Sequence, residues 1–291
     1  MRKAMQKVVS ELVEGDPLTS LFLVDIGVWA FRDLIQRYPG RVKNIGIFEP
    51  GTISIAAGLS LSGITPIVYG ISPFIVQRAL EQLKLDFIYQ KTGGNFITTG
   101  ASYDFSTLGY SHYCPEDVMT LKTLPEFEVL TPATPGQFTY LFKTCAQNGV
   151  PSYFRMTDYC NKNEIHVDFG KAKLIKQGKM GTVVVWAEML DAVIGACSNL
   201  DVSILYFTSV VPFDYEALSR YVDKKLVLCH PFYEGTFSDD IQKIGRNSGI
   251  CEIAVPKKVL RTYGTKRDKD FELSLTPEAI KVRIQNFLIQ P

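Results

Sequence analysis

The sequence predicts a parallel α/β protein with two domains, and three observations support this expectation. Short apolar segments alternate with amphipathic or small-residue segments along most of the chain. Strands that alternate with helices at this spacing form a parallel sheet covered on both faces. A chain of 291 residues is also long for one core. We therefore expect a larger parallel-sheet domain at residues 1–165 and a smaller α/β domain at residues 166–291.

The elements of the first domain follow from the order of the apolar patterns. The chain opens with an amphipathic pattern, and Pro73 suits the first turn of a later helix. Glu116 and Asp117 follow Pro115, where acidic residues favour the first turn of a helix. The predicted strands are residues 20–27, 44–49, 65–71, 95–102, 127–133 and 151–156, and the predicted helices are 1–17, 28–40, 51–63, 73–86, one from Pro115 and one between 133 and 151.

A polar segment at residues 157–181 is the predicted linker, because few contacts would have to cross it. A second alternation follows, and Thr276 and Glu278 suit the start of its last helix. The predicted strands are residues 182–188, 201–209, 225–230 and 251–256, and the predicted helices are 190–200, 213–222, 237–249 and 276–289.

Composition and charge exclude several classes of protein. Hydrophobic residues make up 46% of the chain, which is enough for an extensive core and argues against disorder. The 31 basic and 30 acidic residues nearly balance, and no basic block suggests nucleic-acid binding. No apolar run is long enough for a signal peptide or a membrane span. Six widely spaced cysteines predict free thiols, no metal site and a cytoplasmic location.

Glu49 is the residue that most needs an explanation. It lies between an apolar run and a small-residue segment, and Pro50 follows it. A carboxylate at the carboxyl end of a parallel strand lies where open α/β sheets bind ligands. An acid that begins a helix and favours its dipole would give the same pattern. Common catalytic motifs such as G-x-G-x-x-G, H-E-x-x-H and G-x-S-x-G are absent.

The segment "YPGRVKNIGIFEPGTISIAAGLSLSGITPIVYGISPFIVQRALEQ", residues 38–82, resembles the pyrimidine-binding domain of the transketolase family in the order and spacing of its residues. The likeness resumes at "GYSHYCPEDVMTLKTLPEFEVLTPATPGQ", residues 109–137. It is weaker at residues 210–241 and 263–288, which are similar to the family's C-terminal domain. The resemblance implies a pyrimidine-binding domain followed by a transketolase C-terminal-like domain.

The resemblance also implies roles for residues around the cofactor thiamine diphosphate. Glu49 would share a proton with the aminopyrimidine ring and so activate the cofactor. Phe74 would lie against the ring, or it is a core phenylalanine. Arg78 matches an arginine of the same family segment, or it is a helix-surface residue. Asp25 corresponds to an acid near the cofactor in some members, or it caps the following helix.

His112 matches the family histidine that reaches the reacting part of the substrate, where it would be catalytic and would donate to developing oxyanions. Arg155 matches a family arginine at the substrate, while Asp158 stands where several members have a second, phosphate-binding arginine. An acid there predicts that phosphorylated acceptors are disfavoured. Pro50 replaces the usual glutamine, so one side chain that helps to build the site is missing.

The family holds the diphosphate and Mg²⁺ with a Gly-Asp-Gly motif, which occurs nowhere in this sequence. The resemblance therefore implies the C-terminal subunit of a split transketolase, which moves a two-carbon ketol unit between sugars. Its N-terminal partner subunit would hold Mg²⁺, and two copies of this chain would form a homodimer within an α2β2 heterotetramer. Two alternatives remain: the beta-type subunit of a 2-oxo acid decarboxylating enzyme, and a non-catalytic structural partner.

Overall fold

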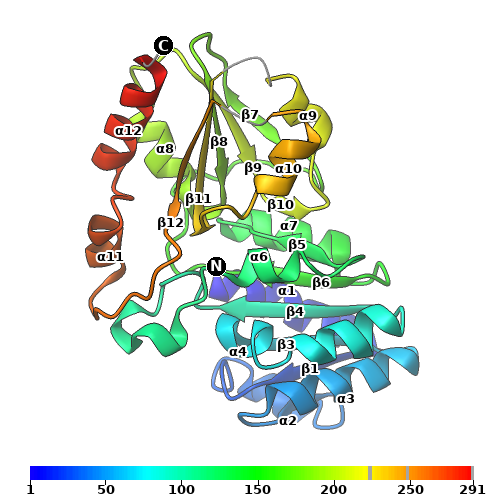
Figure 1. The fold of residues 1–291 in the computed structure, drawn as a ribbon. Coiled ribbons are helices and arrows are strands. Elements are labelled where there is room, and N and C mark those ends of the chain that lie inside the picture. Colours follow the sequence, from blue (N-terminus) through cyan, green and yellow to red (C-terminus); the bar gives the residue numbers. More distant parts are fainter. Residues whose placement is uncertain (222–224, 247–248, 290–291) are drawn as a thin grey trace.

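The computed structural model describes residues 1–221, 225–246 and 249–289, and these residues build two sheets (Figure 1). The last residue of the helix predicted at 213–222 and residues 247–248 of the helix predicted at 237–249 lie outside the described residues. The predicted α/β class with two sheets is confirmed. The division of the chain at residue 165 stays a prediction. None of the described helices combines the length and the apolar character that a membrane span requires.

The first sheet has seven strands in the order β10-β5-β6-β4-β3-β1-β2. All of its pairs are parallel except β10 with β5, which are antiparallel. β10 comes from the second half of the chain and closes the edge of a sheet that the first half otherwise forms. The bounds are β1 Thr19–Leu23, β2 Val42–Asn44, β3 Thr65–Ile71, β4 Gly94–Thr99, β5 Glu128–Leu130, β6 Pro151–Arg155 and β10 Ser209–Val211.

Helices cover both faces of this sheet, and each face has its own core. α1 and α7 pack together on one face, where Val9 of α1 and Phe138 of α7 are fully buried. α3 and α4 cover the other face, where Ile53 and Ile75 are fully buried. The bounds are α1 Arg2–Gly15, α2 Arg32–Arg37, α3 Glu49–Leu61, α4 Ser72–Val76, α5 Leu80–Gln82, a π-helix at Leu83–Tyr89, α6 Asp117–Leu121 and α7 Pro135–Cys145.

Two elements near the predicted site differ from the expectation. The strand predicted at 44–49 ends at Asn44, because Gly46 adopts a positive φ of 84° and turns the chain. Glu49 is instead the first residue of α3, and Pro50 fits its first turn, where no backbone donor is needed. The helix predicted at 73–86 is divided into α4, α5 and the π-helix.

The second sheet has five strands in the order β12-β11-β8-β9-β7, and only β7 is antiparallel. β7 lies within the segment predicted as a linker, and α11 was not predicted. The capping box that Thr265 and Asp268 form at the start of α11 is its sequence signal. The bounds are β7 Lys173–Lys176, β8 Thr182–Trp186, β9 Ser203–Phe207, β11 Leu226–Tyr233, β12 Ile250–Val255, α8 Leu190–Ala196, α9 Tyr215–Ser219, α10 Ser238–Lys243, α11 Lys266–Glu272 and α12 Pro277–Ile289.

Candidate functional site

Glu49 is a nearly buried carboxylate at the carboxyl-end edge of the first sheet, with a relative exposure of 3%. Arg78 Nη1 donates to both of its carboxylate oxygens at 3.2 Å. These distances are longer than the roughly 2.7–2.9 Å usual for charge-assisted pairs. Among the described residues, Arg78 is the one side chain found to donate to this carboxylate. Glu49 is therefore desolvated but only weakly paired, so it can accept a better donor.

Phe74 and Arg78 lie on the segment that begins with α4, and Arg78 reaches the Glu49 carboxylate. The Arg78 guanidinium lies 3.9 Å from the centroid of the Phe74 ring, at cation–π distance. The Phe74 ring also meets the His112 ring edge-on, with centroids 5.2 Å apart. The structure thus brings together Glu49, Phe74, Arg78 and His112, which the sequence analysis had proposed as parts of one site. Arg78 therefore links the Glu49 carboxylate to the Phe74 ring.

His112 ends a short 3-10 turn at Tyr110–His112 in the loop between β4 and α6. Burial lowers the pKa of His112, and the positive charge of Arg78 lowers it further. The imidazole is therefore neutral at pH 7, with one nitrogen able to donate and the other able to accept. Its Nδ1 lies 3.0 Å from Ser111 Oγ, and the ring of Phe105 packs edge-on at 6.4 Å between centroids.

Asp25 follows β1 and adopts a positive φ of 51°. Its backbone N–H donates to Asn44 Oδ1 at 3.0 Å, and Asn44 Nδ2 donates back to its carboxylate at 3.2 Å. These bonds tie together the carboxyl ends of the parallel strands β1 and β2. Its part in cofactor binding stays a prediction.

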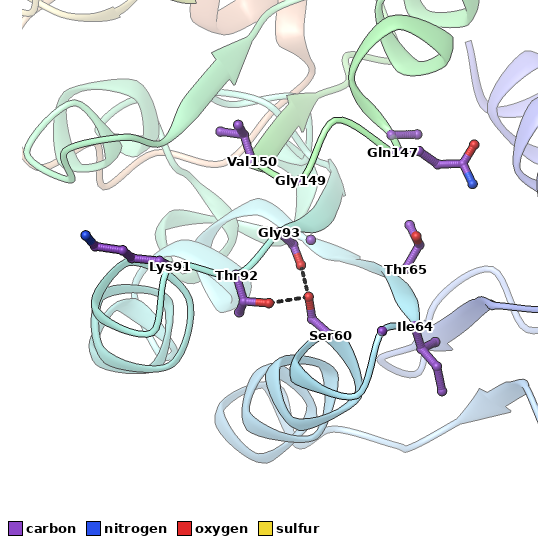
Figure 2. A pocket seen from close by; sticks show the side chains of 12 residues that line it. Ser60, Ile64, Thr65, Lys91, Thr92, Gly93, Gln147, Gly149 and Val150 are labelled. Atoms are coloured by element: carbon purple, nitrogen blue, oxygen red, sulfur yellow. Dashed lines mark hydrogen bonds between the residues drawn. The ribbon is translucent and has the colours of Figure 1, made fainter.

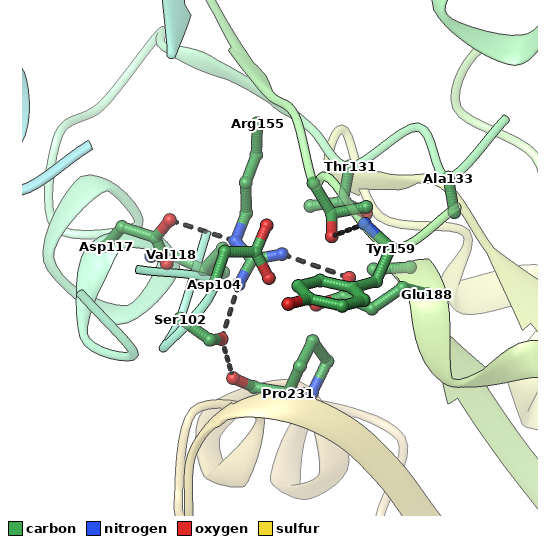
Figure 3. Close-up of polar contacts among 12 residues, drawn as sticks. Ser102, Asp104, Asp117, Val118, Thr131, Ala133, Arg155, Tyr159, Glu188 and Pro231 are labelled. Carbon is green, nitrogen blue, oxygen red and sulfur yellow. Dashed lines mark hydrogen bonds and ion pairs between the residues drawn. The ribbon is translucent and has the colours of Figure 1, made fainter. Parts of the chain in front are cut away.

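Arg155 is 1% exposed, and its guanidinium forms hydrogen bonds with other side chains of the same chain (Figure 3). Nε donates to Asp117 Oδ2 at 2.9 Å, Nη1 to Glu188 Oε2 at 3.2 Å and Nη2 to Ser102 Oγ at 2.5 Å. Burial opposes the charge of Arg155, but Asp117 and Glu188 raise its pKa above the ordinary value. The structure does not bring Arg155 to the Glu49 carboxylate, and its contact with substrate stays a prediction.

Arg2 is a residue near this site that the sequence analysis missed. Its Nη2 donates to Asp158 Oδ2 at 2.6 Å and to Thr99 Oγ1 at 3.2 Å. The guanidinium also lies 5.9 Å from the centroid of the Phe105 ring, which in turn packs on His112. Arg2 and Asp158 are 156 residues apart, so no local pattern could pair them. The negative charge of Asp158 is partly neutralised by this pair.

Asp104 and Glu188 form a second charged feature that the sequence did not reveal. Burial, followed by the charge of Glu188, raises the pKa of Asp104 to about 7. Oδ1 of Asp104 and Oε1 of Glu188 are buried and find no hydrogen-bond partner among the residues that the structure describes. Oδ2 of Asp104 accepts from the backbone N–H of Asp158 at 2.8 Å.

An open pocket of about 320 Å³ lies at the opposite edge of the first sheet (Figure 2). Its walls include Ser60 at the end of α3, Gly94 at the start of β4 and Gln147 before β6. Ligands in open α/β sheets bind at the carboxyl ends of the strands, and this cavity is at their amino ends. Over the described residues, no group of three or more His, Cys, Asp or Glu side chains is arranged to hold a metal ion.

Comparison with known proteins identifies the fold that carries these residues. The family model described as "Transketolase, pyrimidine binding domain" matches residues 1–158. A solved structure described as a split-gene transketolase, in an inactive β4 tetramer, superposes with a TM-score of 0.86. The likeness covers 99% of this chain and 97% of that one at 22% sequence identity, so it shows the shared fold.

Two relatives extend the comparison along the chain. A protein of Rhodococcoides fascians, described as an uncharacterized 33.6 kDa protein in the fasciation locus, is 31% identical over 99% of this chain and 95% of its own. One of the subunits of the apulose-4-phosphate transketolase of Actinobacillus succinogenes is 24% identical over 74% of this chain and 72% of its own. The chain therefore belongs to the transketolase family and carries that family's pyrimidine-binding domain.

Proposed function

We propose that this chain is the C-terminal subunit of a two-subunit, thiamine diphosphate-dependent transketolase that transfers a two-carbon ketol unit between sugars. The observation that carries the proposal is the convergence of Glu49, Phe74 and His112 in a transketolase fold. Arg78 connects the three, since it pairs with Glu49, stacks on Phe74 and lowers the pKa of His112 after the larger effect of burial.

The residues around Glu49 fit the aminopyrimidine end of the cofactor. A desolvated carboxylate with a weak internal partner suits a ring nitrogen that shares a proton, and Phe74 offers an aromatic face to a flat heterocycle. When bound, thiamine diphosphate supplies a nucleophilic thiazolium carbon. Glu49 holds a proton against the ring nitrogen, and a glutamine at this position could only hydrogen-bond. We also keep Arg78 and Asp25 as proposed cofactor-binding residues.

His112 is the proposed catalytic residue on the substrate side. Because its imidazole is neutral at pH 7, it can donate one hydrogen bond to an oxygen that becomes negative during the reaction. Arg155 is retained as a proposed substrate-side arginine, on the strength of the family resemblance alone.

A partner subunit is proposed because the diphosphate half of the site is missing from the sequence, which contains no Gly-Asp-Gly. An exposed apolar surface beside Glu49 supports association with another chain. Ile55 of α3 is 44% exposed, and α3 is joined to the π-helix by a bond from Ser54 to Asp86. The exposed apolar residues of this surface are Ile47, Phe48, Ile55, Leu85 and Tyr89.

We propose a homodimer of this chain within an α2β2 assembly, in which the N-terminal partner subunit holds Mg²⁺, and a cytoplasmic location. The substrates are sugars. An acceptor without a phosphate is favoured, because Asp158 stands where several family members have a phosphate-binding arginine, and the nearby Arg2 is already paired with it.

The two alternatives make different predictions. A 2-oxo acid decarboxylating enzyme would use the same Glu49 with an oxo acid donor, and assays with both donor classes separate the two reactions. A non-catalytic partner would show no turnover in the presence of any N-terminal subunit.

The test of the proposed function is calorimetry with thiamine diphosphate and Mg²⁺. The isolated chain should bind the cofactor weakly, because it offers only the pyrimidine-recognising residues. Copurification and mass spectrometry identify the partner, and its addition should raise affinity sharply. Cofactor should then tighten the two-subunit complex, since linkage is reciprocal. Binding at about 1 μM or tighter, near −8 kcal/mol, to the isolated chain would contradict the split-subunit assignment.

A further inference from the structure

His112 is carried by a loop whose base is held by residues other than Glu49, Phe74 and Arg78. We refer to residues 100–116, between β4 and α6, as the histidine loop. Ser102 and Cys114 form an antiparallel bridge across its base, and the Cys114 N–H donates to the Ser102 carbonyl at 2.7 Å. Everything between these two residues, including Phe105 and His112, forms the tip of the loop. The position of His112 therefore depends on how this base is fixed.

Arg155 joins the two ends of the histidine loop. It donates to Ser102 Oγ at 2.5 Å at the start of the loop and to Asp117 Oδ2 at 2.9 Å just after its end. Asp117 is in turn held by Tyr153, whose hydroxyl donates to the same oxygen at 3.0 Å. Figure 3 shows the guanidinium between these partners. One buried side chain of β6 thus fixes both ends of a loop that projects from β4.

The second sheet and its helices hold the same loop from the other side. Arg155 donates to Glu188, in the turn after β8, at 3.2 Å, and Ser102 Oγ donates to the Pro231 carbonyl of β11. The Tyr233 N–H of β11 donates to the Pro115 carbonyl at 2.9 Å. The ring of Phe232 also lies 4.8 Å from the Arg155 guanidinium, at cation–π distance. None of the described residues of the second half is found in contact with Glu49, Phe74 or Arg78, yet this half anchors the loop that carries His112.

These contacts give Arg155 a structural role that does not depend on its proposed contact with substrate. Its guanidinium is 1% exposed and all three of its nitrogens are engaged. A buried charge is costly unless it is fully paired, so removal of one partner destabilises the contacts of Arg155 with the others. The partners are Ser102 in the histidine loop, Asp117 directly after it and Glu188 in the second half of the chain.

We propose that Arg155 is a positioning residue that fixes the base of the histidine loop against the second half of the chain and thereby sets the distance from His112 to Phe74. The importance of that distance rests on the proposed function, but the positioning itself does not. If the base loosens, the His112 ring moves away from Phe74 and Arg78. Because burial first and Arg78 second lower the pKa of His112, a displaced ring titrates closer to the ordinary histidine value.

The test is NMR titration of the full chain, which has only three histidines. The His112 signal is assigned with His112→Gln. Ser102→Ala removes the hydroxyl between Arg155 and Pro231, and it should raise the pKa of His112. Amide exchange in residues 102–116 should become about ten times faster or more, as loss of a buried hydrogen bond predicts.

Ser152→Ala is the matched control. Ser152 is also fully buried in the first sheet, and its hydroxyl donates to the Glu128 carboxylate at 2.6 Å. Its loss should leave the pKa of His112 and the exchange of the histidine loop unchanged. Equal changes in both variants would mean general destabilisation and would overturn the proposal.

Glu188→Gln is the second variant, and it decides the question if Ser102→Ala does not fold. It preserves the shape of the side chain but removes one negative partner of Arg155, so the pKa of His112 should rise. If His112 in the folded variants has the same pKa as in wild type, the positioning role is overturned. Absence of turnover in the wild-type two-subunit complex would count against the proposed function alone, because the NMR result does not depend on activity.

Discussion

Asp104 is the buried acid whose replacement gives the sharpest stability test. Its pKa of about 7, against an ordinary value of 3.8, means that the folded chain holds a proton which the unfolded chain releases. The associated stability is fully present below pH 3.8 and is lost as the pH rises through 7. Each pH unit in this window corresponds to about 1.4 kcal/mol, so wild type should lose about 3 kcal/mol between pH 5 and pH 8 through this group.

Asp104→Asn replaces the protonated acid by a neutral group of the same shape, so this loss should disappear. The free energy of unfolding of the variant minus that of wild type should therefore be about 3 kcal/mol larger at pH 8 than at pH 5, so the variant gains stability relative to wild type as the pH rises. Urea unfolding followed by the fluorescence of Trp186, which is fully buried, measures this difference. Asp239→Asn, at an exposed acid of α10, is the control and should keep the wild-type pH dependence. A difference between Asp104→Asn and wild type that is the same at both pH values would refute the reasoning.

Three further predictions concern the candidate site. Glu49→Gln should preserve folding but remove most turnover of the two-subunit enzyme. Activity within a factor of about three of wild type would contradict the proton-holding role, since that factor corresponds to only about 0.7 kcal/mol in the activation barrier. Asp158→Arg should shift acceptor preference towards sugar phosphates, measured as a ratio of kcat/KM values; a wild-type enzyme that already prefers a simple sugar phosphate would argue against this. Arg78→Met should raise the pKa of His112 in an NMR titration, because burial persists but the neighbouring positive charge is lost; an unchanged pKa would show that the pair is not coupled.

The extent to which the sequence predicted the fold differs between local and long-range features. The apolar segment of β3 was predicted at its observed residues, 65–71, because a buried parallel strand reads as a continuous apolar run. The strand predicted at 44–49 was misplaced, because β2 is Val42–Asn44 and shares only Asn44 with it. Ile47 and Phe48 are apolar but exposed, and a sequence pattern does not distinguish residues buried in their own core from those available to another chain.

The candidate site divides in the same way. Glu49, Phe74 and His112 could be proposed from the sequence because the family motifs that contain them are local. The Arg2–Asp158 pair and the partners of Arg155 could not, since these contacts join residues that only the tertiary fold brings together. The raised pKa of Asp104 likewise depends on burial and on Glu188, which a linear pattern does not report.

The strand that closes the first sheet has a consequence for biosynthesis. β6 ends at Arg155, but β10 does not begin until Ser209, so 54 more residues (209 − 155) must be made before β5 gains its outer neighbour. At a synthesis rate of about 5–20 residues per second, that interval lasts about 3–11 s. During it, the nascent sheet presents an unpaired edge of the kind that recruits foreign strands. A ribosome-bound chain that stops before Ser209 should therefore need chaperone protection more than one that has passed Val211.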